Sequence, residues 1–70
     1  MELSMIKQLL LSRINFWIKK YKQSKNELIK HSIELVLNEL LVITKDLYDS
    51  HLIGICTYLQ IENKIKSKEK

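Results

Sequence analysis

The apolar residues in the middle of the chain recur with the period of an α-helix. Between residues 29 and 47 they follow one another at alternating steps of four and three, which places them on one side of a helix. Several of these positions hold β-branched side chains, as in the seams of coiled-coil-like helix packing. We therefore predict a helix over about residues 25–53. Its seam consists of Ile29, Ile33, Val36, Leu40, Ile43 and Leu47, flanked by Leu37, Leu41 and Tyr48 on one side and by Leu28, Leu35 and Val42 on the other.

A second helical pattern precedes it, over about residues 3–23. Its main apolar stripe also follows steps of three and four. Met5, Leu9 and Phe16 form a second strip on another side, so this helix is apolar on more than one face. We expect such a helix to lie between partners and to contact more than the second helix. The main stripe comprises Leu3, Ile6, Leu10, Ile14, Trp17 and Tyr21.

The two helices are expected to separate near Ser24. The segment from Ser24 to Glu27 fits a capping box, in which the serine and glutamate side chains satisfy each other's free backbone donors. Glu27 also suits the positive end of the helix dipole. No proline or glycine precedes Gly54, so one continuous helix of about 50 residues is the alternative, but that length exceeds the usual range. We favour a helical hairpin.

The end of the chain is ambiguous. Gly54 is predicted to end the second helix, because glycine readily adopts the left-handed conformation found there. Alternating apolar residues from Ile53 to Ile61 would suit a strand, whereas the spacing of Tyr58, Ile61 and Ile65 would suit a helix. We favour a short third helix over about 55–65. The lysine-rich residues 64–70 are expected to form a frayed basic tail.

Chain length makes the stability of an isolated copy marginal. The chain has 70 residues, and its one cysteine, Cys56, excludes an intramolecular disulfide. Ordering a residue costs roughly 1.5 kcal/mol, while burying a large apolar side chain contributes roughly 1.5–3 kcal/mol, so a small core yields little net stability. We therefore expect one all-α domain over residues 1–63, an antiparallel hairpin completed by self-association into a helical bundle. The partner would be a second copy, forming a homodimer, or a larger protein.

Charge is divided along the chain. Residues 1–26 carry six Lys or Arg and one acid, whereas residues 27–62 carry six acids and two lysines, so the two helices should attract each other. The first helix also ends in four lysines near Trp17 and Tyr21, a combination that can bind phosphates and stack on bases or lie on an anionic surface. The simpler interpretation is a solvated helix end with both aromatic residues in the core. The candidate anion-binding residues are Lys19, Lys20, Lys22 and Lys25.

The residues that catalysis or metal binding would need are sparse. His31 carries no phosphorelay pattern, and His51, Cys56 and Asp49 form a poor metal set without a further ligand. One glycine cannot build a phosphate-binding loop. We therefore predict no catalytic residue, no metal and no cofactor.

No apolar run is long enough to cross a membrane, and the N-terminus lacks the features of a signal peptide. We expect a cytoplasmic protein or one of an organelle interior. Eleven lysines against a single arginine are typical of an AT-rich bacterial, phage or organellar genome.

The segment from Ile29 to Leu35 resembles the serine-glutamine-glutamate-leucine-aspartate signature of sporulation-type aspartyl-phosphate phosphatases, which are small helical hairpins. Ser32, Glu34 and Leu35 match in place, Ile33 replaces the glutamine, and Val36 stands where the aspartate belongs. The resemblance implies a protein that dephosphorylates a response regulator. Because the aspartate is replaced, a relative that only binds the regulator is the other implication.

Three functional hypotheses follow. The first is a small non-enzymatic regulator or adaptor that binds proteins through its helices. The second is a nucleic-acid or anionic-surface binder that uses the basic end of the first helix, and the third is the phosphatase or its degenerate relative. The candidate partner-binding residues for the first are Leu3, Ile6, Leu10, Phe16, Trp17, Tyr21, Ile29, Ile33, Val36, Leu40, Ile43 and Leu47.

Overall fold

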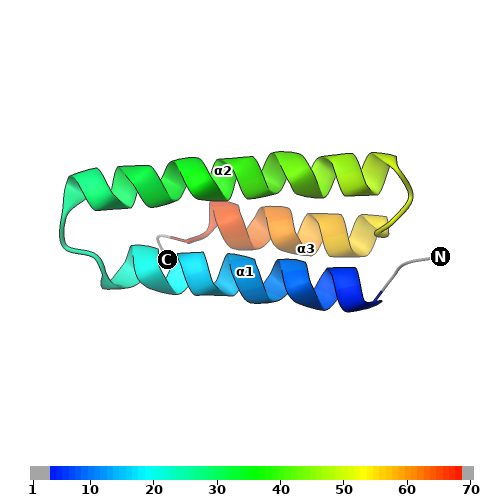
Figure 1. Ribbon diagram of the computed structural model, residues 1–70, viewed down its shortest axis with the longest axis horizontal. Coiled ribbons are helices and arrows are strands. Elements are labelled where there is room, and N and C mark those ends of the chain that lie inside the picture. The colour runs from blue at the N-terminus through cyan, green and yellow to red at the C-terminus, as the bar shows by residue number, and fades with distance from the viewer. Residues whose placement is uncertain (1–3, 69–70) are drawn as a thin grey trace.

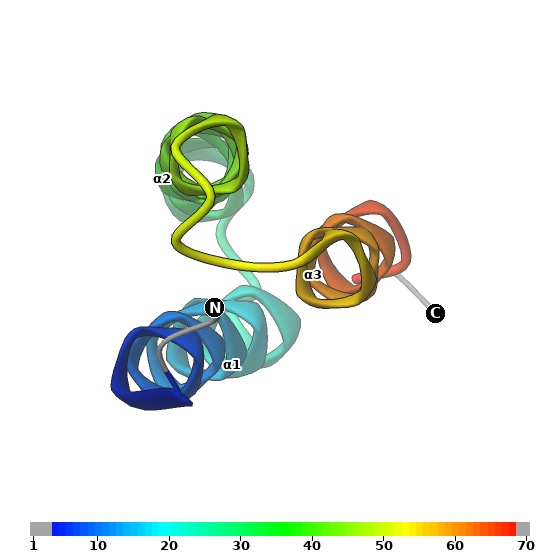
Figure 2. The same cartoon turned by 90° about the vertical axis from the view of Figure 1, so that its right-hand side faces the viewer.

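The computed structural model describes residues 4–68, which form three helices: α1 (Ser4–Gln23), α2 (Glu27–Asp49) and α3 (Ile55–Lys66). Helices α1 and α2 form an antiparallel hairpin, and α3 runs back antiparallel to α2 (Figure 1). Seen end-on, the helix axes form a triangle (Figure 2). The prediction of an all-α fold with a hairpin is confirmed, and the ambiguous segment after Gly54 is a 12-residue helix rather than a strand.

The core lies where the three helices meet. Ile14 of α1, Leu37 of α2 and Ile61 of α3 are each 0% exposed. Thr44 is also fully buried, and its hydroxyl donates a hydrogen bond to the Leu40 carbonyl at 2.7 Å, which satisfies it inside an apolar environment. As the apolar pattern of the first helix predicted, α1 packs against both other helices. The remaining buried apolar residues are Leu10, Tyr21, Ile33, Ile53 and Ile65.

The buried face of α2 is rotated relative to the predicted seam. Ile29 and Ile43, both predicted seam residues, are 51% and 45% exposed, whereas the flanking Leu37 is fully buried. The cause is α3, which packs on that flank; Tyr48 of α2 and Tyr58 of α3 stack there with ring centroids 5.3 Å apart. The core of α2 therefore faces both α1 and α3, which the prediction of a two-helix seam did not include.

The turn between α1 and α2 is capped by a different residue from the one predicted. Asn26 is the N-cap of α2, and its side-chain oxygen accepts hydrogen bonds from the backbone N–H groups of Leu28 (2.8 Å) and Ile29 (3.4 Å). The capping box led by Ser24 was therefore wrong. Ser24 instead stabilises the turn itself, since its hydroxyl accepts a hydrogen bond from the Asn26 N–H at 3.3 Å.

Helix α2 ends at Asp49 rather than near residue 53. His51 takes the left-handed conformation (φ 63°) that was predicted for Gly54, which instead has φ −86° and is the N-cap of α3. The N–H groups of His51 and Leu52 donate to the carbonyls of Tyr48 and Leu47, the two bonds of a Schellman motif. This earlier reversal lets Ile53 enter the core at 3% exposure.

The predicted frayed tail is partly helical. Helix α3 continues to Lys66, because Ile65 is 2% exposed and holds the last turn against the core. Beyond it, the Lys68 ammonium lies 5.4 Å from the centre of the Tyr21 ring. Residues 69 and 70 of the predicted tail lie outside the described residues.

The cap of α2 gives a direct stability test. Asn26→Ala should lower the free energy of unfolding by about 1 kcal/mol, because two N–H groups of the first turn lose their acceptor. Asn38→Ala, at an exposed position within α2, is the matched control and should cause no loss. Urea unfolding followed by circular dichroism measures both. Equal effects of the two substitutions would show that Asn26 is not the cap.

The Tyr58 phenol gives a test based on pH. Burial raises its pKa above the ordinary value of 10.0, and the nearby Glu62 carboxylate, which accepts its hydrogen bond at 3.3 Å, raises that pKa further. The folded state thus holds this proton more tightly than the unfolded chain. The resulting stabilisation is present below pH 10.0 and is lost as pH rises through the higher pKa.

We therefore expect the wild type to lose stability above about pH 10 more steeply than Tyr58→Phe, which lacks the titrating group. Melting temperatures measured across the alkaline range for both proteins provide the comparison. Lysine titration affects the two alike and cancels in the difference. If the melting temperatures of the two proteins fall in parallel with pH, the pKa of Tyr58 is not raised by folding.

Candidate protein-binding face of α1 and α2

One face of the α1–α2 hairpin is left uncovered. Helix α3 lies on one side of the plane through α1 and α2, and the other side faces solvent (Figure 2). Eight of the 11 large apolar side chains that are exposed belong to α1 and α2. We call these eight the open face: Met5, Leu9, Phe16, Leu28, Ile29, Leu35, Val42 and Ile43.

Helical spacing shows why these side chains gather. On α1, Leu9 follows Met5 by four residues and Phe16 follows Leu9 by seven, so the three share one side of the helix. Asn15 lies about 120° around α1 from Leu9, and it accepts a hydrogen bond from Lys64 of α3 at 3.3 Å. Helix α3 therefore packs on a different side of α1 from the open face.

The same holds on α2, where two rows of the open face repeat every seven residues. Leu28, Leu35 and Val42 form the outer row, with exposures of 79%, 54% and 54%. Ile29 and Ile43 belong to the inner row, which lies on the side of α2 nearer to α1. Both rows lie away from Tyr48, the α2 residue that stacks on α3.

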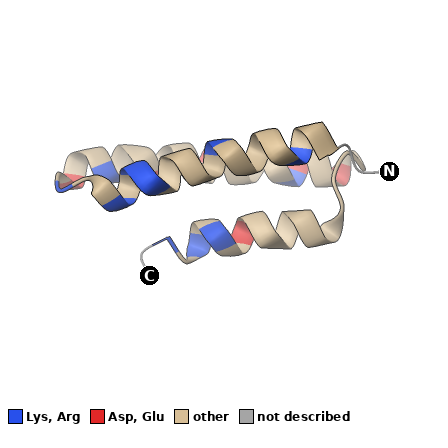
Figure 3. Cartoon of the chain, turned by 90° about the horizontal axis from the view of Figure 1, so that it is seen from below, with Lys and Arg blue, Asp and Glu red and all other residues tan. Residues whose placement is uncertain are grey.

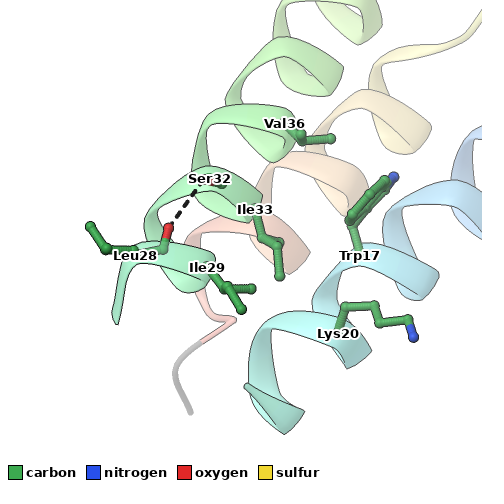
Figure 4. Close-up of a pocket in the computed structure, with 7 residues that line it drawn as sticks. All are labelled: Trp17, Lys20, Leu28, Ile29, Ser32, Ile33 and Val36. Atoms are coloured by element: carbon green, nitrogen blue, oxygen red, sulfur yellow. Dashed lines mark hydrogen bonds between the residues drawn. The ribbon is translucent and has the colours of Figure 1, made fainter. Parts of the chain in front are cut away.

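A groove of about 460 Å³ lies between α1 and α2 at the end near their connecting turn. In Figure 4, Ile29 and Ile33 project from α2 toward Trp17 and Lys20 of α1. The hydroxyl of Ser32 donates to the Leu28 carbonyl at 3.1 Å, so it is satisfied within its own helix. The wall is therefore mainly apolar. The lining residues are Trp17, Lys20, Leu28, Ile29, Ser32, Ile33 and Val36.

Charges of opposite sign lie beside the apolar rows of the open face, and one of them, Lys20, lines the groove. Arg13 and Lys20, seven residues apart, lie on the α1 half, and Glu39 and Asp46, also seven apart, lie on the α2 half; all four are exposed. Among residues 4–68 the salt bridge present joins Lys66 to Glu62 within α3, at 3.6 Å. The predicted attraction between the basic and the acidic helix therefore produces no direct ion pair between the described residues of α1 and α2.

The structure divides the twelve predicted partner-binding residues between the core and the open face. Leu10, Tyr21 and Ile33 are buried in the core, so they stabilise this copy rather than forming a surface. Ile6, Trp17, Leu40 and Leu47 pack against that core and are half-buried. Val36 is half-buried in the groove, while Phe16, Ile29 and Ile43 are exposed on the open face. Leu3 lies outside the described residues.

Five open-face residues were absent from that prediction. They had been recognised in the sequence only as secondary strips beside the main stripes. The sequence signal that indicates them is that the two helices carry more apolar positions than one hairpin interface can bury. These residues are Met5, Leu9, Leu28, Leu35 and Val42.

The lysines of three helices meet at one end of the bundle. The four predicted anion-binding lysines are all exposed, and the C-terminal end of α3 brings further lysines beside them (Figure 3). The ammonium groups of Lys30 and Lys68 each lie 5.4 Å from the centre of the Tyr21 ring. The set is Lys19, Lys20, Lys22, Lys25, Lys30, Lys64, Lys66 and Lys68.

The described residues that were considered for catalysis or metal binding do not come together in one site. His31, His51 and Cys56 are exposed. Within residues 4–68, no three His, Cys, Asp or Glu side chains come together as a metal site would need. Ser32 lies in the groove, whereas Glu34, two positions later, lies on nearly the opposite side of α2. The residues that carry the resemblance to the phosphatases therefore do not form one surface.

Comparison with known proteins adds no identification. Searches of protein-family models, curated proteins and solved structures find no match to this chain. Of the helices in the described part of the chain, none has the length and apolar character required to span a bilayer.

Proposed function

We propose that this protein is a small non-enzymatic regulator or adaptor that binds other polypeptides through the open face of α1 and α2. The observation that supports it is the gathering of eight exposed large apolar side chains on one side of the hairpin. Exposed apolar side chains scattered singly are ordinary, whereas a contiguous set of this size marks interaction surfaces.

The shape of the face indicates the kind of partner. Two antiparallel helices with an apolar groove between them accept a third helix, whose apolar side chains enter the groove at helical spacing. Trp17 and Phe16, packed edge-to-face at 5.3 Å, supply rigid aromatic area at its rim. An amphipathic helix is therefore the ligand that this surface fits.

The first test uses a synthetic amphipathic helical peptide with leucine at every a and d position of three heptads. Trp17 is the only tryptophan of the chain and lines the groove, so its fluorescence reports occupancy. Ile29→Glu should raise the peptide dissociation constant at least about tenfold, because Ile29 lines the groove and binding would bury an unpaired carboxylate there.

Leu59→Glu is the matched control. Leu59 is 51% exposed, the same fraction as Ile29, but lies on α3 away from the open face. It should leave peptide affinity unchanged. A peptide that does not alter Trp17 emission when the protein is diluted until it is monomeric, or that binds both variants equally, would contradict the proposed function.

A second candidate function is the binding of nucleic acid or another polyanion at the lysine-rich end. The observation that favours it is the convergence of lysines from α1, α2 and α3, which adds to the cluster that the sequence places on α1 alone. Lysines bind phosphates as point charges and release condensed counterions, so such binding weakens steeply with salt.

An oligonucleotide titration tests this candidate. For a single-stranded DNA followed by fluorescence anisotropy, replacing both Lys22 and Lys25 by Glu should weaken binding and make the salt dependence shallower by about one unit of slope. Lys45→Glu, on α2 at the other end of the bundle, is the control for added negative charge. Affinity that does not change with salt would exclude the polyanion function.

A further inference from the structure

We infer that the occupant of the open face is a second copy of this chain, related by a two-fold axis parallel to the helices. In this dimer α1 of each copy packs antiparallel on α2 of the other, and the two α3 helices lie on the outside. The inference rests on the proposed function, since it names the partner of the same face.

The size of the face suits a dimer. The bundle measures 41 by 17 by 16 Å along its principal axes, so one long face has a projected area of about 700 Å². A stable protein interface buries roughly 800 Å² on each partner, and its side chains add area beyond the backbone projection. A second copy covers the whole face, including the outer row at Leu28, Leu35 and Val42, which a single added helix in the groove would leave partly exposed.

The charges on the face are self-complementary. A two-fold interface uses the same patch on both copies, so each group must meet a suitable group of its own chain. Cations lie on the α1 half and acids on the α2 half, so packing α1 on α2 of the other copy pairs opposite charges. The alternative axis, perpendicular to the helices, would place α1 against α1 and like charges together.

The positions of the charged residues along the helix axes support the same two-fold axis. Helices α1 and α2 are antiparallel about the turn near residue 25, so residues equally distant from that turn lie at similar heights. Arg13 and Glu39 are 12 and 14 positions from it, a difference of about 3 Å along the axis at 1.5 Å per residue. An axis parallel to the helices preserves height and brings Arg13 of one copy opposite Glu39 of the other.

Helix directions agree as well. In the resulting four-helix core every neighbouring pair is antiparallel, as in up-and-down bundles, and the dipoles of adjacent helices oppose one another. The two lysine-rich ends come to lie at the same end of the dimer, where salt screens their repulsion.

The test is sedimentation equilibrium of the full chain across a range of concentrations. We expect a dimer whose dissociation constant rises about tenfold in Arg13→Glu and similarly in Glu39→Arg, since each creates a like-charge contact at two symmetric places. The double variant R13E/E39R has the net charge of the wild type and should return most of the lost affinity. Circular dichroism checks that each variant remains helical.

Replacing an exposed leucine by glutamate tests which face forms the dimer interface. Leu35→Glu should raise the dimer dissociation constant about 100-fold, while Leu59→Glu, at a similarly exposed position on α3, should leave it unchanged. If both single variants weaken the dimer and the double variant does not restore its affinity, the two-fold axis is not parallel to the helices.

The two proposals fail differently. A chain that stays monomeric up to about 1 mM, while its Trp17 fluorescence still responds to the leucine peptide, overturns the dimer and leaves the proposed function standing. A dimer dissociated by Leu59→Glu but not by Leu35→Glu overturns the dimer geometry and the proposed face together.

Discussion

The structure depends on the contact of three helices in one core cluster, to which Ile14, Leu37 and Ile61 belong. Each side chain comes from a different helix and each is fully buried. Two helices alone would expose at least one side of these residues, so the hairpin needs α3 to close its core. Because a tightly packed interior admits few rearrangements, this contact also fixes how far α1 and α2 are rotated about their own axes. That rotation decides which apolar side chains remain outside.

The position of α3 therefore explains both the core and the open face. By covering the side of α2 that carries Tyr48, α3 draws Leu37 and Thr44 inward and leaves Ile29 and Ile43 exposed on the open face. The helices themselves were predictable, because a spacing of three and four residues is a local property of the sequence. The buried face was not, because it depends on a 12-residue helix whose own pattern also suited a strand. The third helix itself was predicted, but the side of α2 on which it packs was not, and this was enough to misassign several residues of α2.

Helix ends were harder to predict than helices for a different physical reason. Ser24 and Asn26 are both good caps, and the choice depends on which side-chain oxygen reaches the free N–H groups of α2; Asn26 does so at 2.8 Å. After α2, glycine is the usual left-handed residue, yet His51 takes that conformation. The burial of Ile53 requires the reversal three residues earlier than Gly54, so tertiary packing overrides the local preference.

The open face exists because α3 is much shorter than α1 and α2. The bundle has one short helix of 12 residues against two of 20 and 23, so it covers one side of the hairpin and leaves the other side bare. Apolar side chains on that bare side add nothing to the core of one copy and cost solubility if they remain exposed. Their presence at regular helical spacing on both α1 and α2, beside cations on one helix and acids on the other, supports our proposal that a second copy covers this surface. In a chain of 70 residues the same side chains can thus supply both a binding site and the stability that one small core lacks.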